Sequence, residues 1–132
     1  IIKGSKIRYF PFPGEIVGHP SVLSGSIEKI VKSSSKLVGY EGVHGLDLLA
    51  YRFVGDVFSL MKAVSSITDK PVIIAGSIDS KKKIIEVMKS GAQAFTIGTA
   101  ALDGVYTSKG NNLNAQLSKI IEDVTEINAK DL

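Results

Sequence analysis

Short apolar runs alternate along this chain with segments in which apolar residues recur every three or four positions. A continuous run such as Val72–Ala75 is typical of a strand buried on both faces, and the longer spacing is typical of an amphipathic helix. Strands that alternate with helices form parallel βαβ units with right-handed crossovers. The alternation therefore predicts an α/β fold with a parallel sheet.

We count four strand–helix units in this pattern, with strands expected over residues 6–10, 45–52, 71–75 and 93–97. Serine and aspartate at helix starts, and glycine just past helix ends, mark the boundaries of the helices. The first helix is expected from a cap at Ser24 or Ser26 to Gly39, the second after Asp56, and the third from Asp79 or Ser80 to Gly91. The last helix carries an apolar stripe that we expect to face the core: Leu117, Ile120, Ile121, Val124 and Ile127.

The first unit is longer than the others, and its extra residues lie in the loop that contains Glu15 and His19. In parallel α/β folds the loops that follow the carboxyl ends of the strands build the ligand site. We therefore expect this loop on the functional face. His44 precedes its strand and is expected at the opposite end of the sheet, in a structural role.

Two glycine–hydroxyl pairs, Gly76–Ser77 and Gly98–Thr99, directly follow the third and fourth predicted strands. A phosphate group needs close backbone approach, free N–H groups and hydroxyl donors, which a glycine followed by Ser or Thr supplies. A short helix over 100–103 could point its amino end at the same anion. The pairs predict a phosphate site; the alternative is that the glycines serve only the turns.

The segments Lys70–Ser80 and Gly91–Gly104 resemble the last quarter of the ribulose-phosphate-binding barrel superfamily, in the style of the histidine-biosynthesis isomerase and cyclase barrels and the sugar-phosphate epimerases. Ser77 departs from that pattern, because those families usually carry a second glycine there. The resemblance implies that Gly76, Ser77, Gly98 and Thr99 bind phosphate. It also implies that the four units correspond to strands five to eight of a (βα)8 TIM barrel.

A full barrel of this kind has roughly 250 residues, and this chain has 132. We therefore expect residues 1–132 to form a single (βα)4 half-barrel unit. That unit would be the C-terminal part of a longer barrel or one half of an assembled one. Its unpaired strand edges and exposed inner face predict a homo-oligomer.

Candidates for acid–base catalysis are Asp47, a charged residue within an apolar strand, and Glu15 with His19 in the long loop. Tyr51 and Arg52 follow at the end of that strand and are candidates for substrate binding. Structural alternatives remain open for each. Asp47 could bind a backbone N–H or Arg52, Arg52 could pair with Asp56, and Glu15 and His19 could pack within the loop.

The composition argues against several other classes. Sixteen basic and thirteen acidic residues give a net charge of +3, and the one dense basic run, Lys81–Lys83, has no aromatic residues between its lysines. We expect that run to be a solvated helix face, and we expect no nucleic-acid partner. The absence of cysteine and the presence of only two histidines predict no metal site and no cofactor. No apolar stretch approaches the ~20 residues of a membrane span, so we expect a cytoplasmic protein without a membrane partner.

Together these features predict an enzyme that acts on a small phosphorylated metabolite, by isomerisation, epimerisation or a lyase reaction with acid–base proton transfer. One alternative is a non-catalytic regulatory barrel that senses a phosphorylated ligand such as glycerol phosphate. A second is a half-barrel unit that functions only on assembly.

Overall fold

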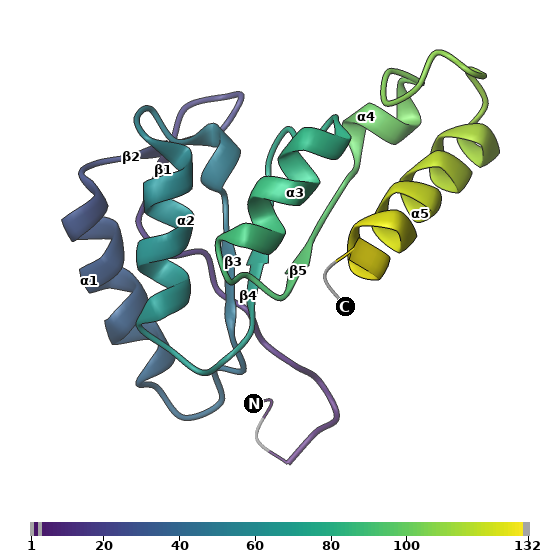
Figure 1. Ribbon diagram of the computed structural model, residues 1–132. Coiled ribbons are helices and arrows are strands. Elements are labelled where there is room, and N and C mark those ends of the chain that lie inside the picture. The colour runs from purple at the N-terminus through teal and green to yellow at the C-terminus, as the bar shows by residue number, and fades with distance from the viewer. Residues whose placement is uncertain (1, 3, 131–132) are drawn as a thin grey trace.

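The computed structural model describes residues 2 and 4–130 of the chain. Its helices and strands follow one another in an α/β order (Figure 1). The elements are β1 (Glu15–Val17), β2 (Val22–Ser24), α1 (Ile27–Val38), β3 (Leu46–Leu48), the 3-10 turn η1 (Ala50–Arg52), α2 (Val57–Ser66), β4 (Val72–Ile74), α3 (Lys81–Lys89), β5 (Ala94–Phe95), α4 (Thr99–Leu102) and α5 (Leu113–Lys130).

A three-stranded parallel sheet in the order β3-β4-β5 lies at the centre. Asp47 pairs with Ile73, and Ile73 pairs with Ala94. The predicted α/β class and parallel sheet are therefore confirmed. Each strand is shorter than predicted, and the end of the predicted second strand forms η1 instead.

The predicted first strand, over residues 6–10, is not formed. The carbonyls of Tyr9 and Pro11 accept hydrogen bonds from the N–H groups of His44 and Asp47, at 2.9 and 3.1 Å, so this segment runs beside β3. Pro11 has no N–H group to donate. The two bonds also lie two residues apart on this segment but three residues apart along the segment that leads into β3, so a regular ladder cannot continue. The described residues thus form three parallel strands rather than a four-unit half-barrel, and they do not close a barrel.

The long loop contains an antiparallel hairpin that the sequence pattern did not indicate. β1 pairs with β2, and a bridge from Leu23 to Phe53 joins the hairpin to the residue after η1. Leu23 is fully buried and is part of the hydrophobic core. The hairpin is therefore anchored at the carboxyl end of the sheet, on the face where the loop was expected.

The helix boundaries follow local capping chemistry. Ser26 and Asp56 cap α1 and α2 by accepting hydrogen bonds from the N–H groups three residues later, at 3.3 and 3.0 Å. Ser80 occupies the cap position of α3, and Gly91, with φ of +86°, follows the end of that helix. Gly39 ends α1. These boundaries confirm those predicted.

The two faces of the sheet differ. Leu46, Leu48, Val72 and Ile74 are fully buried in the core cluster beneath the helices. The helices contact one another in chain order, α1 with α2, α2 with α3, and α3 with α5. Side chains alternate along a strand, so Asp47, Ile73 and Ala94 share the other face, where Ala94 is exposed.

The prediction that the apolar stripe of α5 faces the core is partly wrong. Leu117 and Ile121 are 44% and 66% exposed, whereas Gln116 and Asp123 are buried. Asp123 accepts a hydrogen bond from Tyr106 at 2.9 Å and pairs with Lys81 and Lys119 at 3.2 and 3.0 Å. Charged contacts thus hold α5 to α3 along part of its length. Across residues 2 and 4–130, no helix has both the length and the apolar character to cross a membrane.

Candidate functional site

A small cavity of about 180 Å³ opens at the carboxyl end of the parallel sheet. The carboxyl ends of parallel strands meet at one edge of a sheet, so residues that follow different strands come together there. The lining residues come from η1, from the loop after β4, from the segment after β5 and from the start of α4: Arg52, Gly76, Ser77, Ile78, Thr96, Gly98, Thr99 and Ala100. All four residues predicted to bind phosphate therefore line one cavity, together with Arg52.

Arg52 brings a positive charge to this cavity without a protein partner for it. Within the described residues, its guanidinium group forms no ion pair or hydrogen bond. The alternative of a salt bridge to Asp56 is not realised. The Asp56 carboxylate instead accepts hydrogen bonds from the N–H and hydroxyl groups of Ser59, at 3.0 and 2.8 Å. The backbone hydrogen bond from Ser59 is the largest cause that lowers the pKa of Asp56. Arg52 is thus available to an anion.

The two glycines of the cavity serve different purposes. Gly76 has φ of +87°, and a Cβ atom there would lie 2.8 Å from Cγ of Arg52 and 3.2 Å from Cδ1 of Leu49. The fold alone requires glycine at that position. Gly98 has φ of −120°, and a Cβ atom there would meet no atom within 4 Å. Contacts within the described structure therefore give no reason for glycine at position 98.

Several hydrogen-bond donors around the cavity have no acceptor among the described residues. They include the backbone N–H groups of Ser77, Ile78, Thr99 and Ala100 and the hydroxyl groups of Ser77 and Thr99, both of which are exposed. Gly76 and Ser77 both have positive φ, +87° and +51°. Successive N–H groups in such a turn form an anion-binding concavity. The lining is therefore rich in donors and suits an anionic group.

Asp47 lies in the middle of β3, on the open face of the sheet, and does not line the cavity. Its Oδ1 atom is buried and has no hydrogen-bond partner in the described structure. Burial raises the pKa of Asp47 above the ordinary aspartate value. The alternative that this oxygen is satisfied by Arg52 or by a backbone N–H group is not realised.

Glu15 and His19 lie apart from the cavity lining, on the hairpin. Glu15 begins β1 and lines a separate hollow of about 300 Å³ with Lys29 and Ser33. His19 lies in the turn between β1 and β2, and both side chains are exposed. No hydrogen bond joins them, so the expected acid–base pair is not assembled in this structure.

Tyr51 turns away from the cavity. Its hydroxyl group donates to Oε2 of Glu86 at 2.9 Å and lies 3.2 Å from the carbonyl oxygen of Lys83, both on α3. Burial, followed by the Glu86 carboxylate, raises the pKa of Tyr51. The structure thus places Tyr51 as a link between η1 and α3, whereas its neighbour Arg52 lines the cavity.

The lysine run at the start of α3 is not the solvated face that its charge indicated. Lys82 is 86% exposed, as expected. Lys81 pairs with Asp123 and Glu126 on α5, and Lys83 pairs with Asp79 at 2.9 Å. The four-residue spacing from Asp79 to Lys83 is a sequence signal that could have indicated this second pair.

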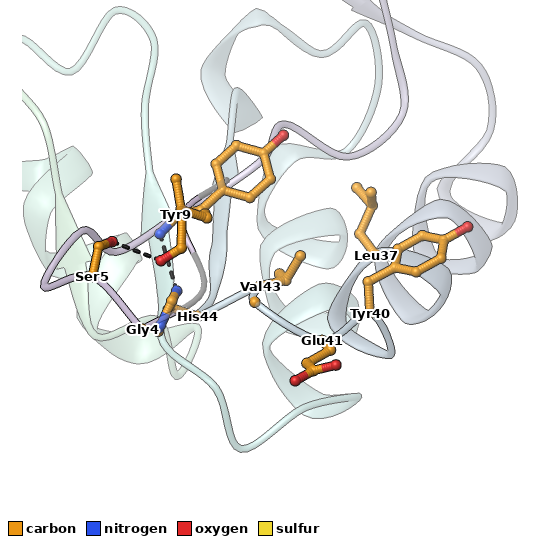
Figure 2. A pocket seen from close by; sticks show the side chains of 10 residues that line it. Gly4, Ser5, Tyr9, Leu37, Tyr40, Glu41, Val43 and His44 are labelled. Carbon is orange, nitrogen blue, oxygen red and sulfur yellow. Dashed lines mark hydrogen bonds between the residues drawn. The ribbon is translucent and has the colours of Figure 1, made fainter.

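A larger hollow, of about 690 Å³, lies at the other end of β3 (Figure 2). Tyr9, Leu37, Tyr40 and Val43 give it a largely apolar lining. His44 lies at that end of the strand, as predicted, and its Nδ1 atom accepts a hydrogen bond from the Tyr9 N–H group at 3.1 Å. We take the smaller cavity as the candidate site, because Arg52 and both glycine–hydroxyl turns line it.

The described residues contain no cluster of three or more His, Asp or Glu side chains that could hold a metal ion. The candidate site accordingly rests on Arg52, two hydroxyl groups and backbone N–H groups. No protein-family model matches the chain, and neither the curated proteins nor the solved structures include a match to it.

Proposed function

We propose that this protein binds the phosphate group of a small phosphorylated metabolite in the cavity at the carboxyl end of its parallel sheet. The observation that carries the proposal is that Arg52, whose guanidinium group has no ion pair or hydrogen bond among the described residues, lines one cavity with the turns at Gly76–Ser77 and Gly98–Thr99. Guanidinium and backbone N–H donors are the groups that proteins use to bind phosphate. The resemblance of these two turns to phosphate-binding barrels supports the same ligand.

The size of the cavity supports an anionic group rather than a whole metabolite. Sites that enclose complete small molecules occupy about 300–1,000 Å³, and this cavity has about 180 Å³. The cavity can hold a phosphate group, and the rest of the ligand would extend over the open sheet face or toward the hairpin. Those regions carry the acid–base candidates Asp47, Glu15 and His19.

The reaction that we propose is isomerisation, epimerisation or a lyase reaction on the anchored metabolite, with proton transfer by one of these groups. Asp47 is favoured among them because its burial raises its pKa toward the range of a general acid–base. None of the three lines the cavity among the described residues. That observation favours the alternative function, a binding protein that senses a ligand such as glycerol phosphate without turning it over.

Isothermal titration and thermal-shift measurements with inorganic phosphate, glycerol phosphate and ribulose phosphate test the binding proposal. Glycerol and ribulose serve as neutral controls. We expect the melting temperature to rise with each phosphorylated compound at millimolar concentration and to be unchanged by the neutral ones. Lack of stabilisation by all three phosphorylated compounds would refute phosphate binding.

The same compounds separate the catalytic and sensory alternatives. NMR spectra of each phosphorylated metabolite, recorded with the protein in deuterated water, would reveal exchange of a carbon-bound proton or formation of product. Exchange that disappears in the Asp47→Asn variant supports the enzyme. Binding without exchange or product for any compound supports the sensor.

We also propose that the chain assembles into a homo-oligomer. Support comes from β5, which pairs only with β4 among the described residues, and from the exposed Leu113, Leu117 and Ile121 of α5. A free edge and an exposed apolar row on neighbouring elements are features that proteins usually cover. Sedimentation velocity tests this assembly, and a monomer at all concentrations up to the millimolar range contradicts it.

A further inference from the structure

The loop between β4 and α3 is held by a side chain that does not line the cavity. The ammonium group of Lys83 donates to the carbonyl oxygen of Ser77 at 2.6 Å and to Oδ2 of Asp79 at 2.9 Å. The same ammonium lies 5.1 Å from the centroid of the Tyr51 ring. Three partners therefore fix the position of Lys83, and Ser77 belongs to the candidate phosphate site.

The bond to Ser77 fixes the orientation of one peptide group. In a trans peptide the carbonyl oxygen of one residue and the N–H group of the next point in opposite directions. Because Lys83 holds the Ser77 carbonyl oxygen, the N–H group of Ile78 points away from Lys83. Ile78 lines the cavity, and its N–H group has no acceptor among the residues described.

This peptide lies in a part of the chain that needs external support. Ser77 has φ of +51°, a conformation that is uncommon for residues other than glycine. Ile78, which follows, is 2% exposed and is anchored in the core. Rotation of the peptide between them would present its carbonyl oxygen to the cavity and repel an anion.

We propose that Lys83 is a positioning residue for the anion site, because it holds the Ser77–Ile78 peptide with its carbonyl oxygen outward and its N–H group available to the cavity. This inference rests on the proposed phosphate binding. Lys83 does not contact the phosphate. It acts through the peptide that does, and Asp79 and Tyr51 keep its ammonium group in place.

The neighbouring lysine provides a matched control. Lys82 is 86% exposed, its ammonium lies 4.0 Å from the Glu86 carboxylate, and no hydrogen bond or ion pair joins its side chain to the Ser77 loop among the described residues. Lys82→Met and Lys83→Met remove the same charge from adjacent positions of one helix. A general attraction between α3 and an anion would weaken in both variants, whereas an effect through the peptide would be confined to Lys83→Met.

The test is a phosphate titration of the whole chain, followed by NMR, on the wild type and the variants Lys83→Met, Lys83→Arg and Lys82→Met. We expect the phosphate Kd to rise about tenfold in Lys83→Met, as for loss of one hydrogen bond to a charged group. Lys82→Met should stay within about twofold of the wild type, and Lys83→Arg, which keeps a cationic donor, should recover most of the affinity. In the free protein, the Ser77 carbonyl carbon and Ile78 amide shifts should change in Lys83→Met but not in Lys82→Met.

The results separate this inference from the proposed function. Phosphate binding that is equal in Lys83→Met and the wild type, or equally weakened in Lys83→Met and Lys82→Met, would overturn the positioning role. If the wild type does not bind phosphate, the proposed function fails. The NMR chemical shifts of Ser77 and Ile78 then test whether Lys83 holds the peptide between them. Unchanged Ser77 and Ile78 shifts in Lys83→Met would then refute the role of Lys83 as well. Lys83→Gln, which keeps a polar side chain that ends short of the Ser77 carbonyl, replaces Lys83→Met if that variant does not fold.

Discussion

Cγ of Arg52 lies 2.8 Å from the point that a Cβ atom on Gly76 would occupy. The absence of a side chain at position 76 therefore lets the arginine pass over the loop after β4 and reach the cavity. Gly76 also has φ of +87°, which residues other than glycine rarely adopt. The glycine thus serves both the turn and the position of the arginine.

Gly76→Ala should destabilise the fold and weaken phosphate binding together. The left-handed conformation costs a residue with a Cβ atom about 1–3 kcal/mol, and the new methyl group would displace Arg52. Urea unfolding measures the first effect, and a phosphate titration measures the second. An alanine variant with wild-type stability and affinity would contradict both reasons for glycine at this position.

Gly98→Ala should separate those two effects. Its φ of −120° is not left-handed and a Cβ atom would meet no atom within 4 Å, so we expect a change in unfolding free energy within about 0.5 kcal/mol. The methyl group would border the cavity and hinder close approach of an anion. Phosphate titration of this variant against the wild type should show weaker binding, and unchanged affinity would reduce Gly98 to a turn residue.

Arg52→Gln should weaken phosphate binding without loss of stability, because the guanidinium group makes no ion pair in the described structure. Charge-assisted hydrogen bonds contribute about 1.5–3 kcal/mol, so the phosphate Kd should rise by about ten- to a hundredfold. Arg8→Gln is the matched control, since Arg8 is exposed and lies outside the cavity lining. Equal losses in the two variants would indicate a general effect of net charge.

Asp47→Asn should stabilise the protein at neutral pH. Burial raises the pKa of Asp47 above its ordinary value of 3.8. The stability linked to this group is therefore present below 3.8 and is lost as the pH rises through the higher folded-state pKa. Removal of the charge should raise the free energy of unfolding by about 0.5–1 kcal/mol at pH 7 and leave it unchanged near pH 3. Urea unfolding of the variant and the wild type at both pH values measures this difference. A destabilised Asn variant at pH 7 would show that the charged carboxylate has a stabilising partner.

Asp123→Asn should remove much of the acid sensitivity of the contact between α3 and α5. Burial opposes ionisation of Asp123, but hydrogen bonds from Lys119, Tyr106 and Lys81 outweigh it and lower its pKa below 3.8. The stability that follows is present above 3.8 and is lost as the pH falls through the lower folded-state pKa.

The Asn variant should lose about 2–3 kcal/mol of unfolding free energy at pH 7, and its difference from the wild type should shrink progressively as the pH falls below 3.8 toward the lower folded-state pKa. Urea unfolding across this pH range measures both. Glu122→Gln is the control, because Glu122 pairs with the same Lys119 at 3.0 Å but has a 56% exposed side chain. A loss in Glu122→Gln as large as in Asp123→Asn would argue against a special role for the buried carboxylate.

Local chemistry explains which features of the fold could be predicted. A cap at Ser26 or Asp56 depends on hydrogen bonds to residues three positions away, and a buried strand such as Val72–Ile74 depends on its own apolar run. The adjacency of Gly76–Ser77 and Gly98–Thr99 followed from parallel pairing of the strands before them. Helix positions, the parallel sheet and the convergence of the two turns were therefore predictable.

Contacts between distant segments account for the errors. Whether residues 6–10 form a strand depends on the match of Tyr9 and Pro11 to β3, and the exposure of Leu117 depends on where α5 packs. The side chains of adjacent residues can also point to different places, because Arg52 lines the cavity while Tyr51 turns toward α3. Periodicity does not specify any of these outcomes.

The sequence by itself determined that two glycine–hydroxyl turns lie at the same edge of a parallel sheet, because the strand–helix–strand order predicts parallel strands and each turn directly follows its strand. Tertiary structure alone decided that Arg52 joins them without a partner among the described residues, that Asp47 lies outside their cavity, and that Lys83 holds the carbonyl of Ser77. The physical reason is that a side chain's partners depend on which groups the packed elements bring within hydrogen-bonding distance, and local patterns do not encode that distance.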